Sequence, residues 1–101
     1  MINKKHIVHP GKVILEEFIK PLGLTQKEAA KGSGISQSRL SELVNGKRQI
    51  SAECALRLSL FFGMDEQTWL NLQNNYDRQI LKNTKANTIR KQVHPYTPCR
   101  P

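Results

Sequence analysis

The stretch TQKEAAKGSGISQSRLSELVNGKRQ at residues 25–49 contains two short helical patterns separated by glycines. Thr25 is a favourable N-cap residue, and the Glu28 side chain can reach back to accept a hydrogen bond from the backbone N–H of Thr25. The pattern breaks at the GSG tripeptide at 32–34, where glycine can adopt a positive φ without a Cβ clash. Ser36 can cap a further helix. The stretch therefore predicts two helices joined by a sharp turn.

The second helix of this pair has an apolar face and a polar face. At about 100° per residue, its apolar side chains fall on one stripe that is expected to face the core. That stripe consists of Leu40, Leu43 and Val44. The opposite face consists of Ser38, Ser41, Glu42 and Asn45, with Gln37 and Arg39 at its edges. Short hydrogen-bonding groups of this kind suit contact with base edges in the major groove of DNA.

A basic loop follows this second helix. Asn45 and Gly46 form a C-cap signal, and Lys47 and Arg48 come next, where a phosphate backbone would pass a bound helix. Two helices joined by a glycine-rich turn also occur in helical bundles that never bind DNA. The polar helix face and the basic loop together favour DNA binding, so the stretch is interpreted as a DNA-binding helix-turn-helix.

Length and charge agree with a small nucleic-acid-binding protein. The chain has 101 residues, of which 38% are hydrophobic, enough for one small helical core. The formal net charge of +8 is unevenly spread. Residues 21–50 carry five Lys or Arg against two Asp or Glu, and residues 84–101 carry four basic residues and no acidic one. Residues 51–83 carry three basic residues against four acidic ones. Positive charge therefore concentrates on the DNA-binding half and on the C-terminal segment.

Three further helices are predicted around the helix-turn-helix. The first opens at Pro10 and ends before Pro21. Another runs from a Ser51 cap to Gly63, with an apolar arc wide enough for the central helix of the bundle. The last begins after an Asp65 cap and ends near residue 83. Together they predict an all-α, five-helix domain.

The last predicted helix carries two apolar faces. Its main stripe consists of Trp69, Leu72, Tyr76 and Ile80 and is expected to lie on the core. Leu70, Leu81 and Asp77 form a second face, which is suited to joining two subunits or else consists of scattered surface residues. We therefore predict a domain at residues 1–83 that includes a C-terminal dimerisation helix. Residues 84–101 are polar and basic and carry three prolines, so a flexible, non-helical tail is expected there.

Cysteine content and hydropathy indicate in which cellular compartment the protein is expected. The chain has two cysteines, Cys54 and Cys99, so no disulfide framework or metal-ligand spacing can be built, and no metal or cofactor is expected. No apolar run approaches the length of a membrane span, and the N-terminus lacks the apolar core of a secretion signal. These features favour a cytoplasmic protein, and DNA binding would place it at a bacterial nucleoid.

Several motifs in this chain occur together in one known family. They are HPG at 9–11, LEEF at 15–18, PLGLTQ at 21–26, LVNGKRQI at 43–50, ALRL at 55–58, FG at 62–63, and WLNLQ at 69–73 with YD at 76–77. On these motifs residues 9–77 resemble the HigA antitoxin family of Xre-type, lambda-repressor-like proteins. The helix-turn-helix part is shared by many phage and plasmid repressors, whereas the HPG and WLNLQ…YD motifs point to HigA.

The resemblance implies a homodimer that binds operator DNA and represses its own operon. It also implies neutralisation of a co-encoded HigB toxin resembling RelE-type messenger-RNA endonucleases, so that the ribonuclease chemistry belongs to the partner. Carried over by position, Gln26 would contact a phosphate and brace Gln37. The residues that would enter the major groove are Gln37, Ser38 and Arg39, with Ser41 and Glu42 further along the same face. Those that would hold the DNA backbone are Asn45, Lys47 and Arg48.

Two residues depart from the family pattern. Ser33 stands where an apolar residue usually packs under the turn, which puts the tightness of the turn in question. Glu42 places a carboxylate on the DNA-facing side, where phosphates would repel it unless it accepts a hydrogen bond from a cytosine amino group. Toxin contacts are not transferred, because some relatives use a longer N-terminal segment for them.

Other functional classes explain the sequence less well. An enzyme would need a convergent set of nucleophile, base or metal ligands, whereas His6, His9 and His94 are placed at flexible ends without a carboxylate pattern. The toxin itself would require alternating strand patterns, and no clear one occurs. A stand-alone Xre-family repressor without a toxin shares all the DNA-binding residues and stays open as the alternative function.

Overall fold

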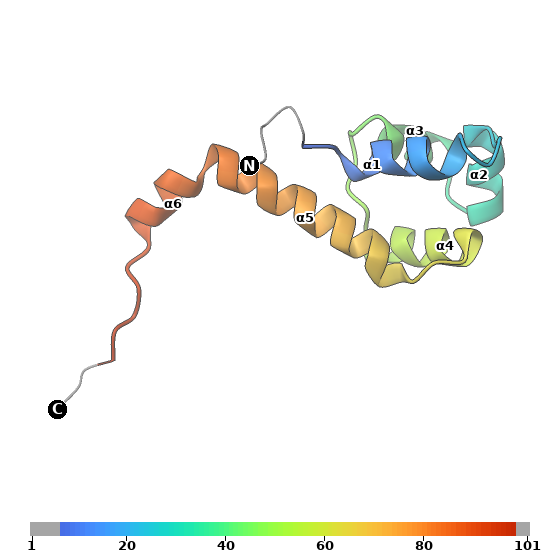
Figure 1. Cartoon of the computed structure of the whole chain (residues 1–101). Helices are drawn as coiled ribbons and strands as arrows, with labels where there is room; N and C mark the ends of the chain where they lie inside the picture. The colour runs from blue at the N-terminus through green and yellow to red at the C-terminus, as the bar shows by residue number, and fades with distance from the viewer. Residues whose placement is uncertain (1–6, 99–101) are drawn as a thin grey trace.

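The computed structural model describes residues 7–98, and within this range all regular structure is helical (Figure 1). The elements are α1 (Pro10–Val13), η2 (Ile14–Ile19), α2 (Gln26–Ser33), α3 (Gln37–Val44), α4 (Ala52–Phe62), α5 (Glu66–Thr84) and α6 (Ala86–Gln92). The all-α class and the four longer helices, α2 to α5, are confirmed. The first predicted helix is present as α1 and η2, although its π-helical part was not predicted, and the short helix α6 was not predicted from the sequence.

The first helix changes its hydrogen-bonding pattern part of the way along. It begins after His9, whose Nδ1 accepts a hydrogen bond from the Gly11 N–H (2.9 Å). From Ile14 it continues as the π-helix η2, in which bonds run to the fifth residue back. The wide turn brings Ile14 and Ile19, five positions apart, into the core together, where both are buried. A prediction based on the 3.6-residue period cannot distinguish this turn from an ordinary helix.

A glycine allows α1 to pack directly on the end of α3. A Cβ built on Gly11 would lie 1.7 Å from the carbonyl oxygen of Leu43, so any larger residue would push the two backbones apart. The HPG motif therefore serves a close helix-to-helix contact, and it holds the C-terminal end of α3 against the N-terminal helix.

The caps predicted for the helix-turn-helix are present. The Thr25 hydroxyl oxygen accepts from the Glu28 backbone N–H (3.0 Å), and the Glu28 carboxylate accepts from the Thr25 N–H (2.9 Å). This reciprocal pair is the capping box. Gly34 ends α2 with φ of +73°, and the Ser36 hydroxyl oxygen accepts from the Arg39 N–H (3.2 Å) to start α3.

Ser33 closes the turn through hydrogen bonds instead of apolar packing. Its buried hydroxyl donates to the Ala29 carbonyl oxygen (2.7 Å) and accepts from the Ile35 N–H (3.4 Å). The same Ile35 N–H also reaches the Ala30 carbonyl oxygen (3.1 Å). Because the hydroxyl is satisfied on both sides, the polar residue at this position fits a tight turn.

The core is centred on Trp69 of α5. Its side chain is 0% exposed and lies between Phe18, with ring centroids 4.8 Å apart, and Phe62, with centroids 5.9 Å apart. The predicted α3 stripe is confirmed, because Leu40, Leu43 and Val44 are all buried. Helix α4 packs on both α5 and α2, but Leu56 and Leu60 are 46% and 77% exposed, so one side of the helix predicted to be central faces solvent.

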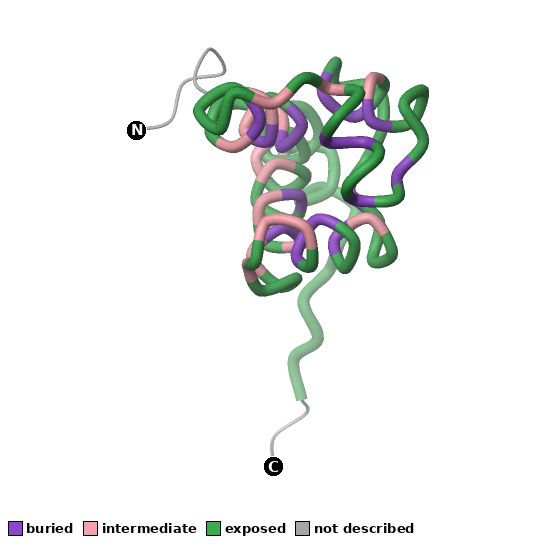
Figure 2. The backbone as a smooth tube through the Cα atoms, turned by 90° about the vertical axis from the view of Figure 1, so that its right-hand side faces the viewer, coloured by how far each residue is buried: buried purple, intermediate pink, exposed green. Residues whose placement is uncertain are grey.

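The second half of α5 leaves the helical body. Figure 1 shows α5 running outward with α6 at its far end, and Figure 2 shows that buried residues are confined to the body. The predicted core stripe is therefore wrong at Ile80, which is 37% exposed, although Leu72 and Tyr76 are half-buried. On the second face, Leu70 is half-buried and Leu81 is 46% exposed.

The expectation that residues 84–101 contain no helix is wrong for Ala86–Gln92. These seven residues form α6, separated from α5 by Lys85, whose φ of −127° breaks the helical run. Alanine, arginine, lysine and glutamine favour helix, and no proline occurs before Pro95. No residue of α6 is buried, so the helix has no apolar stripe by which the sequence could reveal it. Cys99 lies outside the described residues.

Between residues 7 and 98 the structure contains no helix that is both long and apolar enough to cross a membrane.

We expect the substitution Trp69→Ala to lower the free energy of unfolding by about 3–5 kcal/mol, because it empties the centre of a small core. Trp69→Phe is the matched control and should cost less, because it keeps an aromatic ring in the core and the indole N–H that it removes has no hydrogen-bond partner among the described residues. Chemical denaturation followed by circular dichroism measures both. Equal stability of wild type and Trp69→Ala would contradict this description of the core.

Candidate nucleic-acid interface

Helix α3 presents the predicted polar face to solvent. Gln37, Ser38, Arg39 and Glu42 are exposed, and Ser41 is half-buried. The buried stripe on the other side fixes the orientation of α3, so Gln37, Ser38 and Glu42 face away from the body. A helix is about 10–12 Å across and the DNA major groove is about 12 Å wide, so α3 can enter the groove with its polar face toward the bases.

The loop after α3 leaves in a defined direction. The Asn45 side-chain amide donates to the Ser41 carbonyl oxygen (2.8 Å), and Gly46 follows with φ of +76°. The Lys47 backbone N–H then returns to the Glu42 carbonyl oxygen (2.8 Å). The predicted backbone-binding residue Asn45 therefore caps α3 in the structure, while the Lys47 side chain is exposed at the start of the loop.

Glu42 is paired with Arg48 across the end of α3. The Arg48 Nε and Nη2 both donate to Glu42 Oε1, at 3.0 and 2.8 Å. Both side chains are about half exposed, so the pair contributes little to stability, on the order of 0–1 kcal/mol. It does orient the guanidinium alongside α3. This pairing gives the carboxylate, whose role the sequence left open, a partner within the chain.

Gln26 lies at the first position of α2 and is half-buried. The resemblance implied that it braces Gln37, but no hydrogen bond joins these two side chains in the described part of the chain. Both side chains are therefore placed at the α2–α3 surface without being fixed to each other. Their neighbours Thr25 and Ser36 are engaged in capping, which positions the two glutamines at the N-terminal ends of their helices.

A buried glutamine of α5 anchors the far end of the loop. Gln73 is 6% exposed, and its Oε1 accepts a hydrogen bond from the Ile50 backbone N–H (2.8 Å). Its Nε2 donates to Asp77 Oδ1 (2.9 Å). Since Ile50 is itself buried, the loop that carries Lys47 and Arg48 is fixed to α5 at the residue where it enters the core. We refer to Gln73, Asp77 and the Ile50 N–H as the α5 clamp.

His9 adds the N-terminal helix to this clamp. Its ring meets Tyr76 edge to face, with centroids 4.8 Å apart. Burial lowers the pKa of His9, and the nearby Asp77 carboxylate opposes this effect. The placement of His9 at a flexible end was therefore wrong. The HPG and WLNLQ…YD motifs, far apart in sequence, meet at this point, and no local pattern in the sequence could have shown that they do.

The arrangement defines a helix-turn-helix domain, with a polar recognition helix beside a basic loop. Among residues 7–98, no three or more His, Cys, Asp or Glu side chains gather where they could hold a metal ion.

Comparisons with known proteins agree with this class. Residues 15–69 match the family described as Helix-turn-helix. Virulence-associated protein I of Dichelobacter nodosus is 42% identical over 83 residues, which cover 82% of this chain and 77% of that protein. A HigA-family addiction module antidote protein from Coxiella burnetii is 37% identical with a TM-score of 0.82, covering 88% of this chain and 97% of the other. The antitoxin HigA of Pseudomonas aeruginosa, solved with the higBA promoter, is 26% identical with a TM-score of 0.85, covering 91% and 100%.

The chain belongs to this helix-turn-helix family and, within it, to the HigA family of Xre-type proteins.

We expect the stability of the protein to fall as His9 becomes protonated. Because burial lowers the pKa of His9 in the folded state below its ordinary value of 6.5, the unfolded chain binds this proton more readily. The contribution of neutral His9 to the free energy of unfolding is therefore fully present above pH 6.5, and it is lost as the pH falls through the lowered pKa that His9 has in the folded protein. Urea unfolding at a series of pH values from about 8 to about 5 measures it.

The control variant is His9→Asn, which can still cap α1 but does not titrate. Its stability should fall less than that of the wild type over the same pH range. If both proteins lose stability in parallel, His9 is not the group responsible.

Proposed function

We propose that this chain is the antitoxin of a type II toxin–antitoxin operon. It binds operator DNA as a homodimer to repress its own operon, and it neutralises a HigB-like toxin, a RelE-type ribonuclease. The observation that carries the proposal is the α5 clamp, because it joins the two HigA-type motifs and fixes the basic loop beside α3. The HigA of Pseudomonas aeruginosa, whose fold this chain shares, was solved with a promoter. Such a protein would act in the bacterial cytoplasm, at the nucleoid.

The proposed homodimer follows from the size of the recognition surface. One eight-residue helix contacts too few base pairs for useful specificity, whereas two copies can bind half-sites about 34–36 Å apart on one face of the duplex. The outer half of α5 is available to join the two copies, since Ile80 and Leu81 are 37% and 46% exposed there. The operator is therefore expected to be palindromic.

The DNA-contacting residues divide into two groups. Gln37, Ser38 and Ser41 have side chains that can form hydrogen bonds with base edges, and these determine sequence preference. Lys47 contacts phosphates, as do Gln26 at the start of α2 and Asn45 at the end of α3. Arg48 reaches the backbone from its position beside Glu42, whose carboxylate orients it.

The proposed toxin surface lies on the slightly acidic segment of the chain, residues 51–83. A ribonuclease that binds RNA is expected to be basic, so it would be repelled by the loop at Lys47 and Arg48. Residues 51–83 carry a slight acidic excess and include exposed apolar side chains on α4, Leu56 at 46% and Leu60 at 77% exposure. A toxin bound there leaves α3 free, so antitoxin with bound toxin can stay on the operator.

We expect Lys47→Ala and Gln37→Ala to affect DNA binding differently. Lys47→Ala removes a phosphate contact, so it should weaken binding to all duplexes and lower the slope of log K against log salt by about one unit. Gln37→Ala removes a base contact, so it should lower the binding free energy by about 1–3 kcal/mol on the promoter duplex and change it little on a scrambled duplex. Fluorescence anisotropy with both duplexes at several salt concentrations measures this, with Ser38→Ala as a second base-contact variant. Equal losses on both duplexes for all three variants would refute the assignment of roles.

Toxin neutralisation and DNA binding are expected to separate by mutation. The double variant Gln37→Ala, Lys47→Ala should lose promoter binding yet still rescue cells from growth arrest when co-expressed with the product of the neighbouring gene. The matched variant Leu60→Lys replaces an exposed apolar side chain of the proposed toxin surface by a positive charge that would repel a basic toxin, and it should do the reverse. Pull-down, growth and promoter binding are scored for each. If a folded double variant loses both activities, one surface serves both partners. If wild type binds the promoter but never protects, the chain is a stand-alone repressor.

A further inference from the structure

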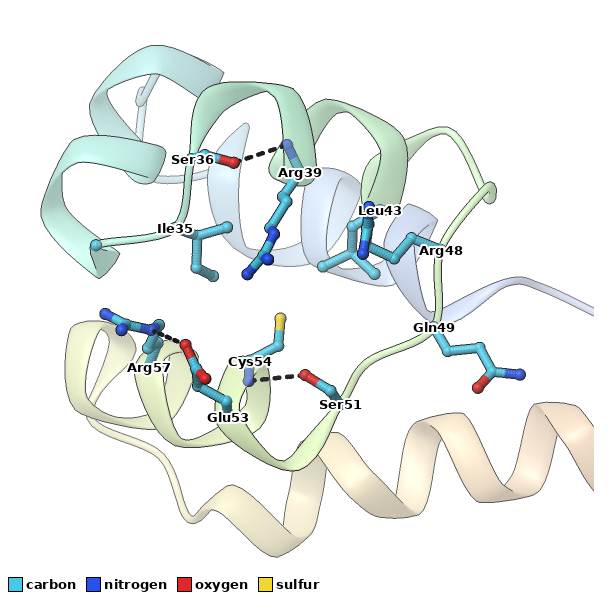
Figure 3. Close-up of a pocket in the computed structure, with 11 residues that line it drawn as sticks. Ile35, Ser36, Arg39, Leu43, Arg48, Gln49, Ser51, Glu53, Cys54 and Arg57 are labelled. Carbon is cyan, nitrogen blue, oxygen red and sulfur yellow. Dashed lines mark hydrogen bonds and ion pairs between the residues drawn. The ribbon is translucent and has the colours of Figure 1, made fainter.

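A groove separates the recognition helix from α4. It has a volume of about 280 Å³ and opens between the helix-turn-helix turn, the flank of α3 and the first two turns of α4 (Figure 3). Ile35 and Leu43 contribute its apolar lining. Its polar lining includes three guanidinium groups, those of Arg39, Arg48 and Arg57.

Arg39 points into this groove and not along the polar face of α3. In Figure 3 its side chain descends from α3 toward α4 and ends in the space above Cys54. On the helical wheel, Arg39 lies about 100° from Ser38, on the edge of α3 nearest α4. The sequence-based assignment of Arg39 to base contact does not match this orientation.

The charges in the groove leave one guanidinium available. Arg57 Nε is paired with Glu53 Oε2 (3.0 Å), and Arg48 is paired with Glu42 (2.8 Å). Within the described residues, Arg39 forms no salt bridge with a carboxylate. The groove therefore combines two oriented, paired arginines with one guanidinium that has no carboxylate partner among residues 7–98.

The backbone of the turn is shaped to admit these groups. A Cβ built on Gly34 would lie 2.6 Å from Arg57 Nη1, so the glycine that ends α2 also leaves room for this guanidinium. Burial raises the pKa of the Cys54 thiol, with a further contribution from Glu53, while the three arginines oppose it. Cys54 is therefore a neutral neighbour in the groove and not a competing anion.

The side of a helix that lies in the major groove faces the sugar–phosphate backbone of the DNA. Because the helix nearly fills the groove in width, side chains at about a right angle to the base-facing direction meet the sugar–phosphate backbone. A guanidinium presents paired N–H donors that match phosphate oxygens. Arg39 occupies such a flank position, beside a groove that carries excess positive charge.

We propose that the groove between α3 and α4 binds a backbone phosphate of DNA, and that Arg39 contacts this phosphate and not a base. The proposal rests on the DNA binding proposed above and changes the role of one residue within it. Arg39 then contributes affinity for every sequence, and preference for the operator comes from the other side chains of α3.

The test compares Arg39→Gln, Arg39→Lys and the charge control Lys31→Gln, which alters an exposed lysine in the last turn of α2. Binding is measured by fluorescence anisotropy at several salt concentrations. One duplex carries the sequence upstream of this gene, and the other is a scrambled duplex of equal composition. Arg39→Gln should weaken both by the same factor, about tenfold or more, and lower the salt slope by about one unit. Arg39→Lys should keep the salt slope, and Lys31→Gln should change little.

Two results would overturn the proposal. If Arg39→Gln weakens binding to the promoter duplex alone, Arg39 contacts a base, and if it changes neither duplex, the groove does not hold DNA. A separate failure, in which wild type binds both duplexes equally, would instead remove the proposed operator function.

The source of the phosphate is tested by NMR. The Arg39 Nε–H resonance of the wild type should shift when the scrambled duplex is added at concentrations that saturate binding. A shift with inorganic phosphate but none with the duplex would contradict the proposal and indicate a site for a small anion.

Discussion

The hydrogen bond from the Ile50 backbone N–H to the buried Gln73 side chain joins the part of the molecule that faces DNA to the part that leaves the body. It spans 23 positions in sequence and is 2.8 Å long. Removing the Gln73 acceptor while the Ile50 N–H stays buried would cost about 1–3 kcal/mol, so this bond favours the position in which the loop is held against α5. Since Gln73 also holds Asp77, and Tyr76 meets His9, one contact region sets the positions of α1, α5 and the basic loop together.

The contacts around Gln73 hold in place the backbone that carries the basic side chains of the interface. Lys47 and Arg48 are exposed, but their backbone is fixed at both ends of the loop, by the Asn45 cap of α3 and by the hydrogen bond of Ile50. Glu42 orients Arg48 along α3, and Arg39, which lines the same groove as Arg48, extends from α3 toward α4. A preorganised basic surface loses less entropy on binding than a flexible one, which favours higher affinity for DNA.

Local features of the fold could be predicted from the sequence, and contacts between distant segments could not. Thr25 and Ser36 were identified as caps because capping depends on spacings of two or three residues, and the α3 stripe follows from helical periodicity. The role of Gln73 is invisible to such patterns, because a polar residue on an apolar stripe resembles a surface residue until its partner is known. The π-helical turn could not be predicted because it lies within an ordinary helical apolar pattern, and α6 could not because it carries no buried apolar stripe.

Native-state hydrogen exchange at the Ile50 amide tests the α5 clamp most directly. In the wild type, this amide should exchange as slowly as the core amides of α4, because it is buried and bonded to Gln73. In Gln73→Leu, which replaces the amide by an apolar side chain of similar size and so removes the acceptor, the Ile50 amide should exchange much faster while α4 stays protected. Exchange of Ile50 in the wild type at the rate of the exposed Arg48 amide would contradict the account, because the DNA-facing loop would then not be held by α5.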